Sequence, residues 1–488
     1  MSGVGRAIAC LLLICLIASV GDVQAQCTAS YTLPGGNCEH QGVACAGDVN
    51  HDGTADWLVG GHGTYAAVYS GLSGSPLYEY SNQGSYFGIS VAGGGDFDGD
   101  DFADYAIGEC NRTINSAGGR VYLYAGASGE VLHELRAPLG AYNFGCSIAI
   151  VGDMNQDGYD EIAVGANCDQ TVGAQGGRVL IYSGFDASVV YDLYGLHAGD
   201  RFGYSVAAAG DVDRDGYPDV VIGATMAAAG RTYVYSGRGG YAIYALGYEA
   251  GYYGYEVAGV GDINNDGYDD FAVGSFLEPY RVTVISGRSG WIIWTIDTPE
   301  GGDLFGISIA ALGDIDVDGY ADFLVGAPNS SLEAWSEGRA YAFSGRTGRE
   351  LFELGGGVDN AHLGWSVASA GDADHNGVTD LLLGGGAFTG SGESSVILLG
   401  TGDCDLVKCC QGKVGDANMS GNDDATLGDI SAIIDFLFIA GTPLPCLEEA
   451  DVNQSGGLWP TEDDITLGDI SVLIDHLFIS NPELPDCL

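Results

Sequence analysis

One phrase recurs seven times along the chain, and it constrains the fold more than any other feature. Its pattern is Asp-x-Asp/Asn-x-Asp/Asn-Gly-x-x-Asp/Glu, with a single departure at the glycine of the second copy. Successive copies start 48 to 58 residues apart, at Asp48, Asp96, Asp153, Asp211, Asp262, Asp314 and Asp372. A period of this length is typical of folds in which each unit buries its apolar faces only by stacking on its neighbours.

Each copy lies among four short runs with strand patterns. In the fourth repeat these runs are residues 202–207, 220–224, 231–237 and 242–246. Four short strands in a repeat of about fifty residues are the pattern of a β-propeller blade. We therefore predict a mainly β fold in which residues 26–402 form a seven-bladed β-propeller.

A closed propeller needs a strand from the opposite end of the chain to complete its last blade. Residues 30–33 and residues 404–407 both have a suitable strand pattern. The sequence does not decide between them.

The acidic loops have the chemistry of calcium sites. In the fourth copy, carboxylates stand at positions 1, 3, 5 and 9, and Gly216 at position 6 permits a sharp turn. Oxygen ligands at alternate positions of a tight loop suit Ca²⁺, and carboxylates this close repel one another unless a cation binds or some are protonated. The predicted ligands of the seven loops are Asp48, Asn50, Asp52 and Asp56; Asp96, Asp98, Asp100 and Asp104; Asp153, Asn155, Asp157 and Glu161; Asp211, Asp213, Asp215 and Asp219; Asp262, Asn264, Asp266 and Asp270; Asp314, Asp316, Asp318 and Asp322; and Asp372, Asp374, Asn376 and Asp380.

Two loops depart from this pattern. Asp101 stands where the second loop should have its glycine, and aspartate tolerates left-handed backbone better than most residues. Glu161 lengthens the last ligand of the third loop.

The charge balance agrees with this interpretation. The chain has 66 acidic and 16 basic side chains and a formal net charge of −50, which argues against binding to nucleic acid or to an anionic membrane surface. Of the acidic residues, 24 are predicted ligands in the seven loops. Sites with a Kd of roughly 0.1–1 mM would together add roughly 3–10 kcal/mol at about 1 mM calcium, so we expect the metal to have a structural role.

Short motifs around the loops carry a family resemblance. An aromatic residue and a glycine precede the loops as Phe87-Gly88, Phe144-Gly145, Phe202-Gly203 and Phe305-Gly306, and Gly326-Ala327-Pro328 follows one of them. The chain thus resembles the FG-GAP repeat family, best known from the β-propeller of integrin alpha chains. The resemblance implies a calcium-stabilised scaffold for recognition of proteins or glycans, and integrin partner subunits and ligand specificity are not carried over.

The N-terminus reads as an export signal. Residues 1–25 contain a positive charge at Arg6, an apolar stretch over 7–18 and a small-residue cleavage site at 23–25. We therefore expect a secreted or cell-surface protein with no membrane span in the mature chain. The eleven cysteines that remain should be mostly disulfide-bonded, with at least one left over.

A second module is expected after a cysteine-rich linker at residues 403–413. Residues 414–488 contain a duplicated loop and helix that resembles a type I dockerin, with EF-hand-like calcium loops. The resemblance implies the ligands Asp416, Asn418, Ser420 and Asp429 in the first loop and Asp451, Asn453, Ser455 and Asp469 in the second. It also implies a cohesin-like or cell-surface partner, although both copies have Leu-Gly before the closing aspartate where partner-binding hydroxyl residues are usual. A disulfide-braced helical cap or sorting unit is the alternative.

Functional motifs favour a binding protein over an enzyme. The chain has no G-x-S-x-G, H-E-x-x-H or P-loop sequence. We predict adhesion or extracellular scaffolding through the blade loops, with an extracellular protein or glycan as partner. The alternative is a polysaccharide-binding, lectin-like protein or a polysaccharide-degrading lyase or hydrolase. The tryptophans are expected to pack within and between blades rather than to form sugar platforms.

Overall fold

The computed structural model describes the repeat region of the chain. The described residues are 29–34, 41–61, 65–81, 86–111, 119–226, 230–247, 251–276, 280–297, 303–316, 318–331, 335–356, 359–373, 375, 377–385 and 395–399. The predicted signal, linker and dockerin-like module lie outside these residues. Within the described part we find no helical segment that could serve as a membrane span.

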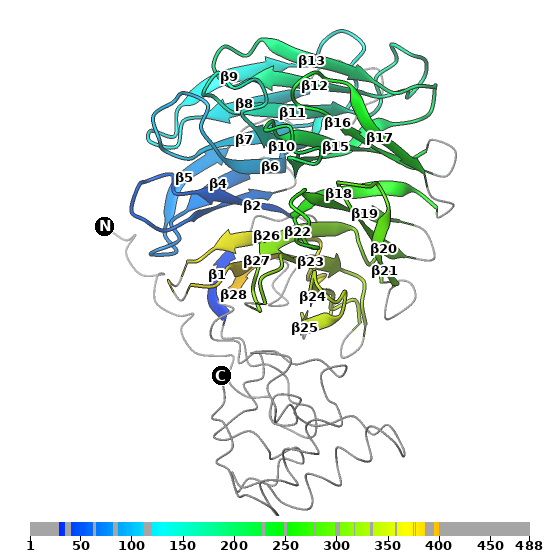
Figure 1. The fold of residues 1–488 in the computed structure, drawn as a ribbon. Coiled ribbons are helices and arrows are strands. Elements are labelled where there is room, and N and C mark those ends of the chain that lie inside the picture. The colour runs from blue at the N-terminus through cyan, green and yellow to red at the C-terminus, as the bar shows by residue number, and fades with distance from the viewer. Residues whose placement is uncertain are drawn as a thin grey trace, which may run out of the picture.

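Four-stranded antiparallel sheets make up the whole of the described fold (Figure 1). Six of them use four strands that are consecutive in the chain, and we number these sheets one to six. Sheets one to three contain β2 (Gln41–Gly47), β3 (Asp56–Gly61), β4 (Tyr65–Tyr69) and β5 (Pro76–Ser81); β6 (Phe87–Gly95), β7 (Asp104–Glu109), β8 (Arg120–Tyr124) and β9 (Val131–Arg136); and β10 (Phe144–Gly152), β11 (Glu161–Ala166), β12 (Arg178–Ser183) and β13 (Val189–Tyr194). Sheets four to six contain β14 (Phe202–Gly210), β15 (Asp219–Ala224), β16 (Arg231–Tyr235) and β17 (Ala242–Gly247); β18 (Tyr253–Gly261), β19 (Asp270–Ser275), β20 (Arg281–Ile285) and β21 (Ile292–Asp297); and β22 (Ser308–Gly313), β23 (Asp322–Ala327), β24 (Arg339–Phe343) and β25 (Glu350–Gly355).

A further sheet combines the two ends of the repeat region. It contains β26 (Ser366–Gly371), β27 (Asp380–Gly384), β28 (Ser395–Leu399) and β1 (Ala29–Pro34), and we call it the composite sheet. Strand β1 pairs antiparallel with β28, from Ala29 opposite Leu399 to Pro34 opposite Ser395. Of the two closing strands that the sequence left open, the structure thus uses the N-terminal one, and residues 404–407 lie outside the described part.

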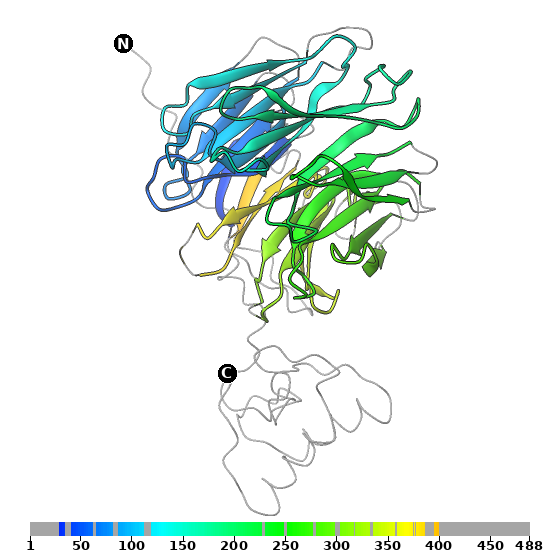
Figure 2. The same cartoon turned by 45° about the horizontal axis from the view of Figure 1, so that its top comes forward.

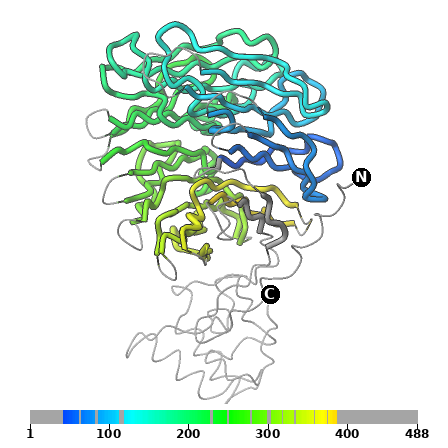
Figure 3. The backbone as a smooth tube through the Cα atoms, turned by 180° about the vertical axis from the view of Figure 1, so that it is seen from behind, coloured from blue at the N-terminus to red at the C-terminus, as the bar shows by residue number. Residues whose placement is uncertain are grey.

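The composite sheet lies between the first and the sixth sheets. Its strand β26 packs against β2 on one side and against β22 on the other, and Figures 2 and 3 show the yellow strands of this sheet beside the blue strands of sheet one. The predicted mainly β propeller is therefore confirmed, as six blades of consecutive strands together with the composite sheet.

In sheets one to six, burial falls from the second strand to the fourth. All six residues of β15 are buried, because its sheet is covered on both faces by neighbouring sheets, whereas β17 alternates between exposed and half-buried positions. This explains the apolar run Val220-Val221-Ile222 after the acidic loop, since a strand covered on both faces has no polar side. The core is a series of clusters between adjacent sheets; one cluster joins Phe144 and Tyr182 of sheet three to Leu123 of sheet two.

The two glycines of the repeat motif meet across the boundary between sheets. Gly364 follows the residue equivalent to the phenylalanine, and its φ of 84° is a left-handed conformation that favours glycine. A Cβ at Gly326, in the preceding sheet, would overlap the carbonyl oxygen of Gly364. The two glycines of the motif are therefore explained by a close approach of backbone atoms between neighbouring sheets.

Serine side chains link the first strands of neighbouring sheets. The Oγ of Ser147 accepts a hydrogen bond from the N–H of Val206 at 2.9 Å, and the Oγ of Ser205 accepts one from the N–H of Val257 at 3.1 Å. Five first strands carry serine at this place, namely at Ser90, Ser147, Ser205, Ser308 and Ser366. In β18 the same place is taken by Glu256, whose Oε2 accepts a hydrogen bond from the hydroxyl of Ser205 at 3.4 Å.

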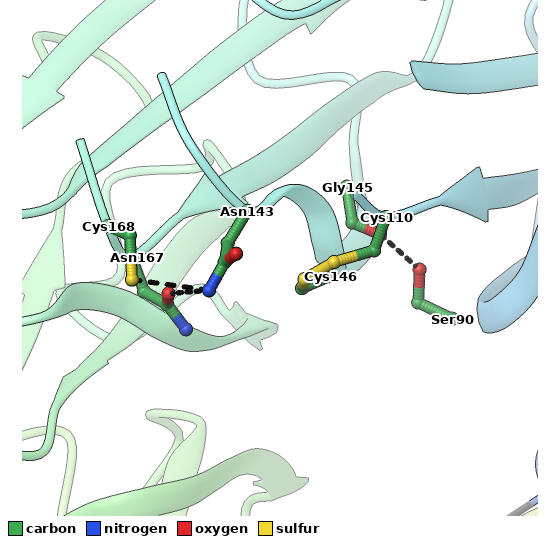
Figure 4. The surroundings of a disulfide bond; sticks show 7 residues. All are labelled: Ser90, Cys110, Asn143, Gly145, Cys146, Asn167 and Cys168. Carbon is green, nitrogen blue, oxygen red and sulfur yellow. Dashed lines mark hydrogen bonds between the residues drawn. A yellow bond between two sulfur atoms is a disulfide. The ribbon is translucent and has the colours of Figure 1, made fainter. Parts of the chain in front are cut away.

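A disulfide reinforces the boundary between sheets two and three. Cys110, just after β7, is bonded to Cys146 in β10 (Figure 4). Among the described cysteines, Cys45 and Cys168 are free. The expectation that disulfides are present is confirmed for one pair, and the cysteines other than these four lie outside the described residues.

Candidate metal centres

Each acidic loop joins the first strand of a sheet to the second. We number the loops 1 to 7 in chain order, so that loop 4 runs from Asp211, after β14, to Asp219, the first residue of β15. The last predicted ligand is the first residue of the second strand in every loop, namely Asp56, Asp104, Glu161, Asp219, Asp270, Asp322 and Asp380. The shared connection places the seven loops at equivalent ends of their sheets.

The first aspartate of a loop shapes its turn. In loop 4, Asp211 accepts hydrogen bonds from the N–H groups of Asp215 at 3.0 Å and Gly216 at 2.9 Å. Gly216 has a φ of 88°, so glycine is favoured at position 6. In loop 2, Asp101 adopts a φ of 66° at the same position, which confirms that aspartate accepts the left-handed conformation there.

The last carboxylate of each described loop is buried beneath the turn. Asp219 accepts hydrogen bonds from the N–H of Val212 at 2.9 Å and the N–H of Gly237 at 3.0 Å. Despite these bonds, burial raises the pKa of Asp219 to about 7, and the nearby Asp213 adds to the rise. Burial likewise raises the pKa of Asp56 to about 6, of Asp104, Glu161 and Asp270 to about 7, and of Asp322 to about 8.

Three loops bring three carboxylates together. Their oxygen atoms lie within 4.8 Å of one another in three groups, which are Asp96, Asp98 and Asp104 in loop 2, Asp211, Asp213 and Asp219 in loop 4, and Asp314, Asp316 and Asp322 in loop 6. These are the three loops whose predicted ligands are all aspartates. We call them the all-carboxylate loops.

Loops 3 and 5 close differently, because position 3 is asparagine. The Nδ2 of Asn155 donates a hydrogen bond to Glu161 at 2.6 Å, and the Nδ2 of Asn264 donates one to Asp270 at 3.0 Å. The amide thus compensates part of the charge of the last carboxylate. No such donor stands at this position in the all-carboxylate loops.

The all-carboxylate loops fit a divalent cation. In loop 4, the Oδ1 atom of Asp213 is buried without a hydrogen-bond partner, and burial together with Asp215 raises the pKa of Asp213. In loop 6, Asp316 is only 6% exposed, and burial together with Asp318 raises its pKa to about 7. Converging carboxylates with a buried, unpaired oxygen are the arrangement that a hard cation with oxygen ligands stabilises.

Most of the predicted ligands lie within the described residues. All four of loops 1 to 6 are described, and in loop 7 Asp372 and Asp380 are described while Asp374 and Asn376 are not. The eight predicted ligands of the dockerin-like module also lie outside the described part. Calcium as the particular ion, and the assignment of each ligand, remain predictions.

Sequence reasoning missed two further carboxylates at these loops. Asp160 and Asp269 stand at position 8 of loops 3 and 5, and each lies against the preceding loop. The sequence signal was an acidic pair, Asp160-Glu161 and Asp269-Asp270, where other loops have a neutral residue before the last ligand.

Arginine–carboxylate pairs at the start of the third strands were missed as well. Arg178 at the start of β12 pairs with Asp192 at 2.6 Å, and Arg339 at the start of β24 pairs with Glu353 at 2.8 Å. These pairs account for part of the acidity outside the loops. The recurring arginine at the first position of the third strand would have revealed them.

Two tryptophans contradict the expectation that they pack within or between blades. Trp57 is fully buried, and the indole of Trp294 donates a hydrogen bond to the carbonyl of Gly345 in the next sheet at 2.7 Å, as expected for packing. Trp291 and Trp335, however, are 76% and 69% exposed, because both stand in connections beyond the covered part of their sheets. For these two side chains the sequence interpretation was wrong.

Comparison with known proteins supports the fold. The family model described as FG-GAP repeat matches residues 202–235, 253–284 and 305–344. Integrin alpha-V of Gallus gallus is 31% identical over 203 residues, which cover 36% of this chain and 19% of the relative. Integrin alpha-5 of Xenopus laevis is 34% identical over 218 residues, covering 39% and 20%, and integrin alpha-4 of Xenopus laevis is 33% identical over 219 residues, covering 41% and 20%.

These matches and the sheets together support a β-propeller that contains FG-GAP repeats at residues 202–235, 253–284 and 305–344. The chain spans about a fifth of the length of these curated relatives. Their names are those of integrin alpha chains, and none is the name of an enzyme.

Proposed function

We propose that this FG-GAP β-propeller is a secreted or cell-surface, calcium-stabilised binding protein that acts in adhesion or extracellular scaffolding. The observation that carries the proposal is the convergence of carboxylates in loops 2, 4 and 6, on a fold whose relatives are integrin alpha chains. Exposed connections at the ends of the sheets would contact an extracellular protein or glycan. The chain would act by binding rather than by catalysis.

Calcium would supply the positive charge that the loops lack. Asp211 would both shape the turn of loop 4 and face the ion, while Asp213 would offer the ion its unpaired Oδ1 atom. Asp219 would tie the site to the sheet, because it begins β15 and is held by two backbone N–H groups. We extend the assignment to the predicted ligands of all seven loops.

The same proposal covers the organisation of the chain. Residues 26–402 form one domain in which the composite sheet serves as the seventh blade, since β26 packs against both β22 and β2. Residues 1–25 direct export. Residues 403–413 are a linker, and residues 414–488 tether the propeller to a partner or to the cell surface.

Removal of calcium tests the structural role of the metal. We would measure the melting temperature of the purified chain in 2 mM calcium, in 2 mM magnesium and in excess EDTA. Filling several loops should raise the melting temperature by several degrees in calcium relative to EDTA, with a smaller gain in magnesium, whose stricter octahedral geometry suits flexible loops less well. Equal melting temperatures in calcium and EDTA would exclude calcium stabilisation.

One observation favours glycan binding as a second candidate function. Trp291 and Tyr241, which are 76% and 53% exposed, stand at equivalent turns of sheets five and four. The hydroxyl of Tyr241 also donates to Asp213 of loop 4 at 3.3 Å, which places an aromatic face beside a candidate metal site. Exposed aromatic rings of this kind can stack on sugar rings.

A polysaccharide and glycan-array screen in calcium and in EDTA separates the two candidates. Calcium-dependent binding that Trp291→Ala abolishes would establish a lectin-like function. Trp335→Ala, on another connection, is the matched control and should bind normally. No binding to any glycan would leave adhesion to proteins, and new reducing or unsaturated ends would instead reveal a polysaccharide-degrading enzyme.

A further inference from the structure

The acidic loops of neighbouring sheets are in direct backbone contact. The N–H of Asp160, at position 8 of loop 3, donates a hydrogen bond to the carbonyl of Asp96, the first residue of loop 2, at 3.0 Å. The N–H of Asp269, in loop 5, donates to the carbonyl of Asp211, in loop 4, at 3.4 Å. The position of a first ligand is therefore tied to the blade that follows it.

In these two pairs of loops, the side chain of the aspartate at position 8 accepts a second hydrogen bond, in the opposite direction. The Oδ2 atom of Asp160 accepts the N–H of Asp96 at 2.9 Å, and the Oδ2 atom of Asp269 accepts the N–H of Asp211 at 2.7 Å. Each carboxylate thus makes a charge-assisted hydrogen bond to the backbone of a first ligand. Two bonds in opposite directions fix that ligand between its own blade and the next.

Each of these carboxylates also lies between the first ligands of two loops. Asp160 is repelled by Asp96 of loop 2 and by Asp153 of loop 3, and Asp269 is repelled by Asp211 of loop 4 and by Asp262 of loop 5. A cation in either loop would relieve this repulsion. Calcium binding in either of two neighbouring loops would therefore change the electrostatic energy of the same carboxylate.

The remaining loops have an uncharged residue at position 8 and so differ from loops 3 and 5. Position 8 is Ala55, Ala103, Pro218, Ala321 or Thr379, none of which carries a charge. The two loops whose first ligand is held by an aspartate of the next blade, loops 2 and 4, are both all-carboxylate loops. The extra carboxylate thus occurs at loops that already concentrate negative charge.

We propose that Asp160 and Asp269 are positioning residues that orient the first metal ligands of loops 2 and 4 and couple each loop to its neighbour, loop 3 or loop 5. The inference rests on the proposed function, in which the loops bind calcium. Neither residue need touch the ion. Each acts through the backbone of Asp96 or Asp211, as partners outside the coordination shell commonly do.

Equilibrium dialysis at buffered free-calcium concentrations provides the test. Asp160→Ala should weaken one site about tenfold, in line with the usual effect of removing a partner of a metal ligand. Asp160→Asn should bind nearly as well as the parent, because its side-chain oxygen can accept the same N–H. Asp186→Ala, at an exposed turn of the same sheet, is the charge control and should leave binding unchanged.

Combining Asp160→Ala with a disabled loop 2 distinguishes positioning of the loop 2 ligand from an effect within loop 3. When loop 2 is disabled by Asp98→Asn together with Asp100→Asn, Asp160→Ala should produce no further loss at that site. An equal loss with and without a working loop 2 would overturn the proposal, as would a variant that binds as tightly as the parent. Asp269→Ala tests the second pair independently if the first variant fails to fold.

Adding an aspartate at position 8 of loop 2 tests whether the same contact can strengthen calcium binding in loop 1. Ala103→Asp places the carboxylate against loop 1, where the N–H of Ala103 already donates to the carbonyl of Asp48 at 3.3 Å. It should tighten calcium binding in loop 1, and unchanged binding there would count against the mechanism. Failure of the proposed function itself would be recognised separately, because the parent chain would then bind no calcium.

Discussion

Glu256 is the one ionisable side chain at a place where five other first strands have serine, and we predict that its replacement by serine stabilises the protein at neutral and alkaline pH. Burial raises the pKa of Glu256 to about 8 from an ordinary value of 4.5. The folded state therefore holds its proton to higher pH than the unfolded state does. By linkage, the contribution of Glu256 to the free energy of unfolding is greatest below pH 4.5 and falls as the pH rises towards 8.

The size of this loss follows from the same shift. Each pH unit between the two pKa values removes about 1.4 kcal/mol, which gives an upper limit of about 3 kcal/mol at pH 7. The residue is partly exposed, so solvent screening reduces the expected effect to about 1–2 kcal/mol. A serine at this place could also bond to the next sheet as Ser205 does, which adds about 1 kcal/mol at any pH.

Calorimetric melting of the parent, Glu256→Ser and Glu256→Gln at pH 5 and pH 8 is the measurement. Saturating calcium should be present throughout, so that the loop carboxylates do not titrate. Both variants should melt higher than the parent at pH 8, by about 2 °C or more, with a smaller difference at pH 5. A stability difference that is the same at both pH values would refute the electrostatic reasoning, and glutamine separates the loss of charge from the gain of a serine hydroxyl.

Three further predictions concern the loops, the disulfide and the close glycine contact. Calcium titration should resolve tighter binding by the all-carboxylate loops, and Asp316→Asn should weaken one of these sites about tenfold; a single uniform class of sites would contradict this. Replacing Cys110 and Cys146, which are 36 residues apart, by serine should lower the free energy of unfolding by about 3–4 kcal/mol, and unchanged melting would argue against the crosslink. Gly326→Ala should destabilise the chain by about 3 kcal/mol or more, because the added Cβ would overlap backbone atoms. Gly319→Ala is the control: it has the positive-φ strain of a turn glycine but open space around it, and it should cost about 1 kcal/mol. Equal costs for the two variants would refute the close-contact explanation.

The repeat predicted the sheets well because its signals are local and recur. The order of four strands around each acidic loop depends on contacts within one repeat, and even the exception at Asp101 follows from the conformational preference of a single residue. The turn geometry of the loops was predictable for the same reason, since the side chain of Asp211 accepts hydrogen bonds from backbone N–H groups four and five positions away.

Features that depend on the boundary between repeats were not predictable. The acidic pair Asp160-Glu161 is visible in the sequence, but the contact of Asp160 with Asp96 exists only because sheet three packs beside sheet two. The choice of closing strand also depends on which chain end reaches β28, and two short segments with similar strand patterns cannot reveal that. The exposure of Trp291 likewise depends on how far a turn extends beyond its neighbours.

The pairing of β1 with β28 has a consequence for how the protein is made. The first described strand of the repeat region pairs with the last described one, so Leu399 is synthesised about 370 residues after its partner Ala29. During that interval β1 and the uncovered side of sheet one are open to mispairing with other chains. Folding of the six consecutive sheets can proceed blade by blade, whereas completion of the composite sheet is a single late event of very high sequence separation. Truncated products of translation would therefore carry an unpaired strand at their start, which makes them natural substrates for chaperones and proteases.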